Sequence, residues 1–389
     1  MNDNFHERLC RCAMGKIFGF EPGIAQVIIE NLGSGASLFA LSQNELYGLL
    51  GPFSKFAPSI NEKALDESAE ELEMLRSMGI SFISELDEEY PCLLKECPDR
   101  PVGLYVKGWK DLESSFREHP PVALVGTRDL SLYGKEWTRR IVDALAGAKV
   151  RPTIVSGMAI GCDINAHLAA CEASLPTVAV LPTCVDTIYP MSHRIYERRI
   201  MENPFSAMLS DYPTGTQAKA INFIRRNRII AGLSFATIIV ESKSVGGGLI
   251  TVNMAQSYGR DIYALPGRID DIRSEGCNTL LQRKIAEPIT DLDVLVEALG
   301  LGLKARRRKN ELSEELREKY AGQLGSRDLE SIVKVAIAIK SRRGISTDEL
   351  CVQLGMDYPE LIRFVGQLEA DGIVSLDLLQ RCSINVKIV

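Results

Sequence analysis

Short apolar runs that alternate with amphipathic segments are the main pattern in the middle of the chain. Runs of this kind are too short for helices, and their unbroken apolar character is typical of strands that are buried on both faces. They predict parallel strands at residues 122–125, 153–155, 177–181, 236–240 and 262–265, with earlier strands at 81–83 and 103–106. Helices are expected between the strands, for example at residues 134–146 and 163–173.

The repeated unit of strand and helix predicts the fold class α/β. Over residues 71–300 we expect an extended Rossmann-like domain with a doubly wound, mostly parallel sheet. Residues 1–70 predict a small helical domain of the helix-hairpin-helix or SAM-like kind, because glycines and Pro52 interrupt short helical stretches. That domain would either contact a DNA backbone or pack without a ligand.

The C-terminal part of the chain predicts a linker and a third domain. Residues 301–327 are rich in charged side chains, which favours a solvated linker over a DNA-binding arm. Residues 328–389 predict a winged-helix domain, with helices at 329–342, 347–354 and 359–371 and strands at 373–376 and 383–386. Arg363 lies among acidic residues such as Glu360 and Glu369, so contact with a protein is the alternative to DNA binding.

Composition and charge narrow the classes of function. The 389 residues leave room for two or three domains, each with its own core. The formal net charge of −6 argues against a protein that coats nucleic acid by bulk charge, so binding of nucleic acid requires a local basic patch. Ten cysteines without C-x-x-C spacing predict free thiols in a reducing cytoplasm, and no apolar stretch is long enough for a membrane span.

Glycine-rich turns follow several of the predicted strands. In an open parallel sheet, ligands bind beyond the carboxyl ends of the strands. Backbone amides at such turns, together with helix N-termini, attract phosphate groups. The turns that would lie there are Gly126-Thr127-Arg128, Ser156-Gly157, Gly246-Gly247-Gly248 and Gly267-Arg268. The set predicts a phosphate-binding rim, although each glycine alone could simply serve its turn.

The segment 223–232 contains three arginines within four positions. Guanidinium groups are always charged and bind phosphate in a fork, so Arg225, Arg226 and Arg228, with Asn227 between them, are candidate phosphate ligands. The alternative is an internal cluster of ion pairs with Asp211, Asp163 or Glu241, and we expect some of both. Phe223 and Tyr189 could stack on bases, but Tyr189 is expected in the core more often than on the surface.

Catalysis and cofactors have weaker support. Asp163 and His167 lie four residues apart on one helix and could form an acid-base or metal pair, but a third ligand is missing. Ser156 follows a strand without the G-x-S-x-G frame of a nucleophile elbow. Neither the G-x-G-x-x-G nor the P-loop pattern is present, so no nucleotide cofactor is expected.

The ordered motifs over residues 75–290 resemble the family of the DNA-processing protein DprA, also called Smf. They include Val125-Gly126-Thr127-Arg128, the segment from Val155 to His167, Tyr189-Pro190, the segment from Arg226 to Ser234, and Leu265-Pro266-Gly267. The resemblance implies a non-catalytic protein that dimerises, binds single-stranded DNA and passes it to the recombinase RecA in natural transformation. It also implies DNA contacts by Gly126, Thr127, Arg128, Ser156, Gly157, Arg194, Arg226, Asn227 and Arg228. The arginine cluster and the glycine-rich turns add Arg225 and Gly247 to the predicted DNA contacts.

Some positions depart from the family pattern. Thr127 replaces the usual serine, Ile160 replaces a basic residue, Pro182 and Cys184 replace glycines, and Ile224 replaces a proline. These changes predict altered loop geometry and weaker DNA binding there. Two other hypotheses are an enzyme that acts on a nucleotide or a phosphorylated small molecule, and an interaction scaffold that works through the C-terminal module.

Overall fold

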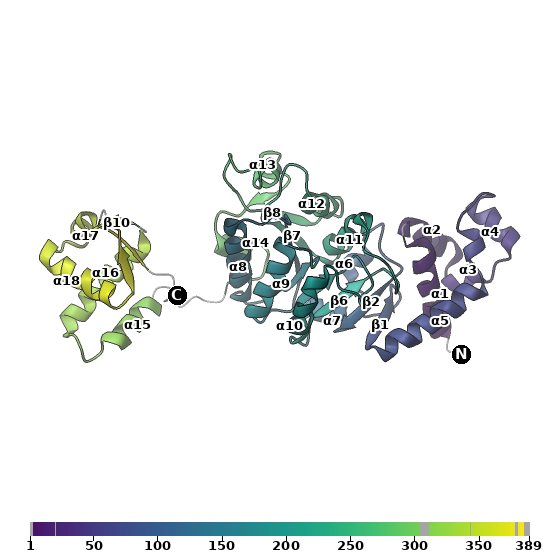
Figure 1. The fold of residues 1–389 in the computed structure, drawn as a ribbon, viewed down its shortest axis with the longest axis horizontal. Coiled ribbons are helices and arrows are strands. Elements are labelled where there is room, and N and C mark those ends of the chain that lie inside the picture. The colour runs from purple at the N-terminus through teal and green to yellow at the C-terminus, as the bar shows by residue number, and fades with distance from the viewer. Residues whose placement is uncertain (1–2, 20, 304–310, 343, 378–379, 385–389) are drawn as a thin grey trace. The chain divides into compact units, whose positions relative to one another are not determined.

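The computed structural model describes residues 3–19, 21–303, 311–342, 344–377 and 380–384. The chain forms two compact units, Met1–Lys304 and Ala305–Val389 (Figure 1). Within the described ranges, no helix has the length and apolar character needed to cross a membrane.

A nine-stranded sheet forms the centre of the first unit, with strand order β1-β2-β6-β5-β4-β3-β7-β8-β9. All neighbouring strands from β6 to β9 pair in parallel, whereas β2 pairs antiparallel with both β1 and β6. The strands are β1 (Ile80–Ser84), β2 (Gly103–Gly108), β3 (Pro121–Val125), β4 (Thr153–Ser156), β5 (Thr177–Val180), β6 (Ala207–Ser210), β7 (Ala236–Ile239), β8 (Asp261–Ala264) and β9 (Glu287–Pro288).

The prediction of a mostly parallel, doubly wound α/β sheet is confirmed. The chain moves from β3 to β4 and β5 in one direction, and later from β7 to β8 and β9 in the other, so the direction of winding reverses between β3 and β7. Two strands of this sheet were not predicted from the sequence. β6 has the sequence Ala-Met-Leu-Ser, which lacks β-branched residues, and β9 has only two residues.

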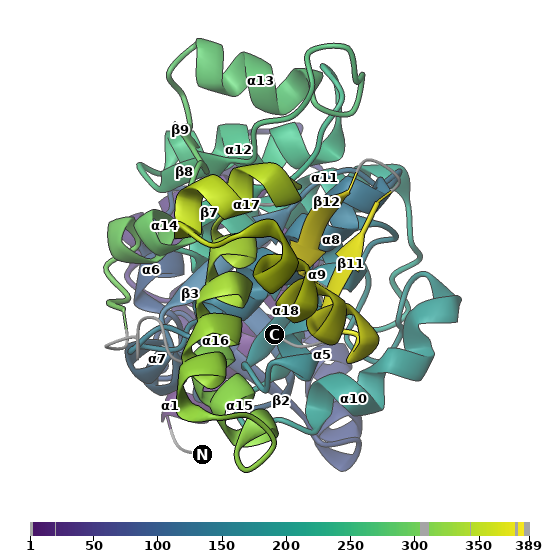
Figure 2. The same cartoon turned by 90° about the vertical axis from the view of Figure 1, so that its left-hand side faces the viewer.

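Helices cover both faces of the sheet, because side chains of each strand alternate between the faces. On β3, Ala123 and Val125 belong to one apolar cluster, and Val122 and Leu124 belong to another. Helices α11 (Ala220–Leu233), α12 (Gly247–Ser257) and α13 (Glu275–Gln282) contribute to the first cluster, and α8 (Leu132–Ala146), α9 (Cys162–Glu172) and α14 (Leu292–Ala298) to the second. The view at 90° shows α12 and α13 beside β8 (Figure 2).

The first and last of the N-terminal helices contact β1, and all but the last share a separate apolar cluster within the first unit (Figure 1). They are α1 (Asp3–Phe18), α2 (Pro22–Leu32), α3 (Gly35–Phe39), α4 (Gln43–Leu50) and α5 (Glu62–Ser77), with the 3-10 turn η1 (Ala57–Ser59). The remaining short helices of the unit are α6 (Cys92–Lys95), α7 (Leu112–Glu118), η2 (Met191–Tyr196) and α10 (Glu197–Met201).

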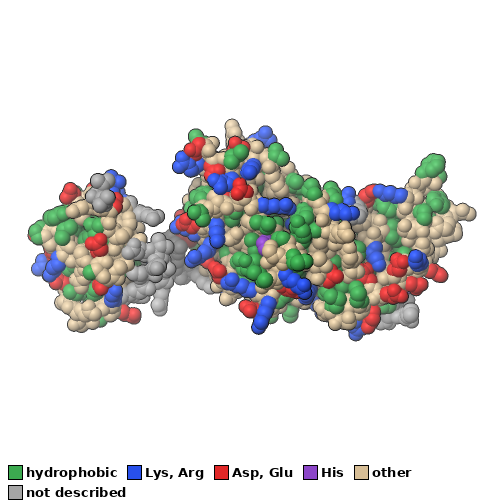
Figure 3. All heavy atoms as spheres, in the orientation of Figure 1, with side chains coloured by type: hydrophobic (Ala, Val, Ile, Leu, Met, Phe, Trp, Pro, Cys, Tyr) green, Lys and Arg blue, Asp and Glu red, His purple; other side chains and the backbone are tan. Residues whose placement is uncertain are grey.

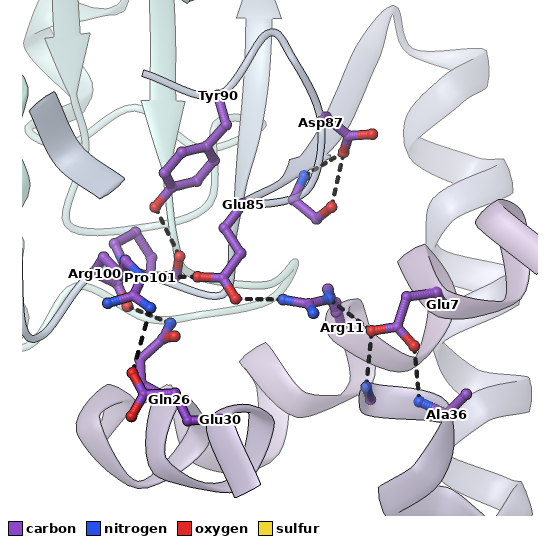
Figure 4. Close-up of polar contacts among 12 residues, drawn as sticks. Glu7, Arg11, Gln26, Glu30, Ala36, Glu85, Asp87, Tyr90, Arg100 and Pro101 are labelled. Carbon is purple, nitrogen blue, oxygen red and sulfur yellow. Dashed lines mark hydrogen bonds and ion pairs between the residues drawn. The ribbon is translucent and has the colours of Figure 1, made fainter. Parts of the chain in front are cut away.

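A buried ion-pair network joins the N-terminal helices to the end of β1 (Figure 4). Arg11 is 1% exposed; it donates to Oε1 of Glu7 at 2.7 Å and also to the carboxylate of Glu85. Arg100 donates to the other oxygen of Glu85 at 2.9 Å. Displacement of the N-terminal helices would separate these buried charges, which is costly. The network therefore favours one position of the helices on the sheet domain.

The second unit is built from helices and a three-stranded antiparallel sheet with order β10-β12-β11. Its elements are α15 (Glu311–Tyr320), α16 (Ser326–Ser341), α17 (Thr347–Leu354), α18 (Tyr358–Ala370), β10 (Ile345–Ser346), β11 (Val374–Leu376) and β12 (Arg381–Ile384). The winged-helix assignment stays a prediction.

Part of the segment that was predicted as a solvated linker, residues 301–327, forms a packed helix in the structure. Helix α15 packs in the core of the second unit through Leu312, Leu316 and Tyr320. The apolar residues at i, i+4 and i+8 form a stripe that the high charge of the segment obscures in the sequence. The basic segment 304–310 of the predicted linker lies outside the described residues.

Candidate nucleic-acid interface

A pocket of about 650 Å³ lies at the carboxyl ends of β3 and β7. This is the point where the winding direction of the sheet reverses, which is the usual ligand site of open α/β sheets. The pocket is lined by the turn 125–129 after β3, by the segment 242–251 after β7 and by the first turns of α11. Its charged lining residues in the described chain are Arg128, Arg226, Lys243, Asp129 and Asp163.

The loops around the pocket are held together by backbone hydrogen bonds. The amide of Thr127 donates to the carbonyl of Glu241 at 2.8 Å, and the amide of Cys162 donates to the carbonyl of Thr127 at 3.1 Å. A Cβ atom on Gly126 would lie 2.9 Å from Sγ of Cys162, so only glycine permits this close approach. Gly161 has φ +85° and packs directly against the carbonyl of Thr127. The three loops therefore form one rigid rim.

Arg128 is the most accessible cation of the predicted phosphate ligands in the pocket. Its side chain is exposed, and the guanidinium carbon lies 4.9 Å from the ring centroid of Phe223. Tyr189 packs edge-on against the same ring, with the centroids 5.4 Å apart. Tyr189 is 46% exposed and lines the pocket, so the expectation that it belongs to the core is wrong. The Phe223 ring, itself packed against Tyr189, holds the guanidinium in place while it keeps access to solvent.

The opposite side of the pocket is formed by the start of α12. This helix begins at Gly247 after the N-cap Gly246, which supplies no side-chain hydrogen bond. Asn227 donates to the carbonyl of Gly247 at 3.3 Å and so ties the first turn of α12 to α11. Lys243 also lines the pocket and lies 3.8 Å from Asp129. Lys243 is not among the residues predicted from the sequence, although its position just after the carboxyl end of β7 is a usable signal.

Arg226 lies in the floor of the pocket and is 2% exposed. Its guanidinium donates to the carbonyl of Gly157 at 2.6 Å and to the carbonyl of Val180, and thereby joins the ends of β4 and β5. Burial lowers the pKa of Arg226 to about 10, and the nearby carboxylate of Asp163 opposes this shift. A side chain at position 157 would collide with the guanidinium, which explains the glycine there.

Arg228 points away from the pocket. It forms an ion pair with Asp211 and donates to the carbonyl of Asp99 at 2.5 Å. Burial raises the pKa of Asp211, and the charge of Arg228 opposes this shift. The ion pair with Asp211 is the internal alternative that the sequence left open. Arg225 is half-buried, and neither it nor Arg228 lines the pocket.

The other predicted contacts lie outside the pocket lining. The hydroxyl of Ser156 is buried and donates to the carbonyl of Leu124 at 2.6 Å, an arrangement that does not leave it free as a nucleophile. Gly157 is buried beneath Arg226. Arg194 is exposed on η2. DNA contact by these residues stays a prediction.

Asp163 and His167 do not form an acid-base pair. The carboxylate of Asp163 accepts a hydrogen bond from the amide of Ala159 at 3.4 Å; burial raises its pKa, and Arg226 opposes the shift. Nδ1 of His167 lies 2.7 Å from the hydroxyl of Thr177, which itself donates to the carbonyl of Ile154. Among the described residues, no group of three His, Cys, Asp or Glu side chains could hold a metal ion.

His167 gives a pH dependence to the stability of the fold. Burial lowers its pKa to about 3, whereas an unfolded chain has the ordinary value of about 6.5. Between these values only the unfolded chain binds the proton, so the free energy of unfolding falls as the pH is lowered through this window, by up to about 1.4 kcal/mol per pH unit. We expect urea unfolding of His167→Gln to depend less on pH between about 7 and 5 than that of the wild type.

The matched control is His6→Gln, because His6 is exposed. This variant should keep the pH dependence of the wild type. An unchanged pH dependence in a folded His167→Gln protein would contradict the assignment of His167 as a buried neutral group.

Comparisons with known proteins identify relatives of this chain. The profile of the family described as "DNA recombination-mediator protein A" matches residues 81–300. "Protein Smf" of Synechocystis sp. is 35% identical over 287 residues, which cover 72% of this chain and 70% of that protein. "DNA processing protein DprA" of Streptococcus pneumoniae is 39% identical over 214 residues, which cover 55% of this chain and 73% of that protein.

A solved structure shows the same architecture. The X-ray structure of DNA processing protein A (DprA) from Streptococcus pneumoniae superposes with a TM-score of 0.60 and 29% sequence identity. The match covers 75% of this chain and 95% of that chain.

Proposed function

Because the chain belongs to the DNA recombination-mediator protein A family, which includes the DprA and Smf proteins, we propose that its pocket binds the phosphate backbone of single-stranded DNA. The observation that carries the proposal is the exposed guanidinium of Arg128, held over Phe223 at a rim of glycine turns. Such a site offers a fixed cation and outward-facing amides to a flexible polyanion.

The candidate contact residues then divide into three groups. Arg128, Lys243 and the backbone of Gly126, Thr127 and Gly247 contact phosphate directly. Arg226, Asn227, Ser156 and Gly157 are buried and position the loops from below, whereas the buried Arg228 anchors α11 to Asp211 and Asp99. Arg194 and Arg225 lie outside the pocket lining and would contact the strand where it leaves the pocket.

The proposed role is non-catalytic and needs no cofactor. The hydroxyl of Ser156 and the imidazole of His167 are both engaged in the sheet interior, which supports this proposal over a nucleotide-processing enzyme. We also propose handover of the strand to the recombinase RecA, in the cytoplasm and in natural transformation; the family description as a recombination mediator supports a role in recombination. A homodimer is part of the proposal, and the exposed Ile269 and Ile272 before α13 are candidates for its contact surface.

A competition experiment tests the proposed function. A fluorescein-labelled oligothymidine should bind with an anisotropy change, and unlabelled single strands should displace it at lower concentrations than the matching duplex. ATP and GTP should not displace it at concentrations where a single strand does. Tight binding of a free nucleotide, with turnover that Asp163→Asn abolishes, would replace the DNA-binding proposal with the enzyme hypothesis.

A further inference from the structure

A group of exposed apolar side chains lies beside the pocket, and we call it the apolar patch. Its members come from the loop after β4, from the segment before and within η2, and from the first turns of α11: Ile160, Tyr189, Met191, Ile195, Ile221 and Ile224. Met191 is 80% exposed and Ile195 is 74% exposed. Hydrophobic side chains gather on the face of the first unit that carries α9 and α10, with Lys and Arg side chains beside them (Figure 3). A contiguous group of exposed apolar side chains often marks an interaction site.

The patch is continuous with the pocket. Tyr189 and Ile224 line the pocket and also belong to the patch. The ring of Tyr189 packs against Phe223, which joins the segment before η2 to α11. On the other side, Nδ1 of His193 lies 2.9 Å from the carbonyl of Met158, which joins η2 to the loop that bears Ile160. A ligand held in the pocket can therefore extend onto the patch without crossing another element.

Arginines alternate with the apolar residues of the patch. Arg194 lies between Met191 and Ile195, and Arg198 follows on α10; both arginines are exposed. Within the described part of the chain, neither arginine forms an ion pair, whereas the neighbouring Arg199 lies 3.3 Å from Glu172. A ligand for this surface must offer negative charge and apolar faces at short intervals. A single strand of nucleic acid has this pattern, because each phosphate is followed by an unpaired base.

We propose that the apolar patch binds unpaired bases of the strand whose phosphates occupy the pocket. This inference rests on the proposed function and adds a base-binding surface to it. Met191 and Ile195 contact base faces, and Arg194 and Arg198 contact the phosphates between them. A duplex stacks its bases inside the helix and cannot present their faces to this surface. The patch therefore gives the protein a physical means to distinguish single strands from duplexes.

Two labelled probes separate base contacts from phosphate contacts. One is an oligothymidine, and the other is an abasic strand of the same length, with the same phosphates but no bases. We expect the wild-type protein to bind oligothymidine about tenfold more tightly than the abasic strand, as stacked bases add affinity to phosphate contacts. The variant Met191→Ser/Ile195→Ser should lose most of this difference and keep wild-type affinity for the abasic strand. Both side chains are exposed, so the variant should fold.

Two further variants serve as controls. Phe53→Ser removes another exposed apolar side chain, 98% accessible, from the segment after α4 and should keep the tenfold difference. Met191→Leu/Ile195→Leu keeps the apolar surface and should also keep the tenfold difference in affinity between the two probes.

Equal affinities of the wild type for the two probes would overturn the base-binding proposal and leave the phosphate proposal standing. Discrimination that persists in Met191→Ser/Ile195→Ser would overturn the assignment of base contacts to the apolar patch. Absence of binding to either probe would overturn the proposed function itself.

Discussion

Replacement of Arg226 by methionine is expected to lower the free energy of unfolding of the first unit by about 3–5 kcal/mol. The guanidinium is 2% exposed and donates to the carbonyls of Gly157 and Val180. Methionine supplies similar apolar volume but no donor. Both carbonyls would lose a partner, and the nearby carboxylate of Asp163 would lose its compensating charge. Urea unfolding followed by far-UV circular dichroism measures the change.

Arg194→Met is the matched control for this experiment, because Arg194 is exposed on η2. Surface substitutions of this kind usually change stability by no more than about 0.5 kcal/mol. If Arg226→Met unfolded like the control and instead lost DNA affinity, Arg226 would be a direct DNA ligand and not a support of the loops.

The second large effect is expected from the double variant Arg128→Ala/Lys243→Ala. Each side chain lines the pocket and is exposed, so its removal deletes a charge-assisted contact with phosphate without disturbing the core. Hydrogen bonds to charged groups contribute about 1.5–3 kcal/mol each before solvent screening, so affinity for a single strand should fall about tenfold to a hundredfold. Fluorescence anisotropy at fixed salt measures the loss.

Arg117→Ala provides the matched control for charge removal. Arg117 is 75% exposed on α7, which ends just before β3 begins, at the edge of the sheet opposite the pocket. Its substitution should leave affinity within about twofold of the wild type, since a distant exposed charge acts weakly through salt. A loss of binding free energy in the control that is half or more of the loss in the double variant, which removes two charges, would indicate binding by overall charge and would contradict a local site.

Much of the sheet domain could be predicted from the sequence, because strands buried on both faces have a distinct composition. The runs that became β3, β4, β5, β7 and β8 were identified for this reason. The pairing of β2 with β6 could not be predicted, since it joins segments about 100 residues apart and β6 carries no strand signal. The position of α15 in the second core was missed because charged residues surround its apolar stripe.

The candidate site shows a similar division. The rule that ligands bind at the carboxyl ends of parallel strands correctly brought Gly126–Arg128 and Gly246–Gly248 together. Which arginines of α11 are buried depends on their position around the helix axis. Asn222, Arg226 and Ile230 are four residues apart and all buried, so Arg226 follows the buried stripe of α11. The number of arginines in the segment does not by itself show that Arg226 is buried.

The salt dependence of single-strand affinity tests the central claim, that the rim around Arg128 binds DNA phosphates. For single strands, the slope of log K against log salt has a magnitude of about 0.7 per neutralised phosphate. Arg128→Ala/Lys243→Ala should therefore reduce that magnitude by about 1.4 relative to the wild type, and Arg117→Ala should leave it unchanged. Identical slopes and affinities for the double variant and the wild type would contradict the claim.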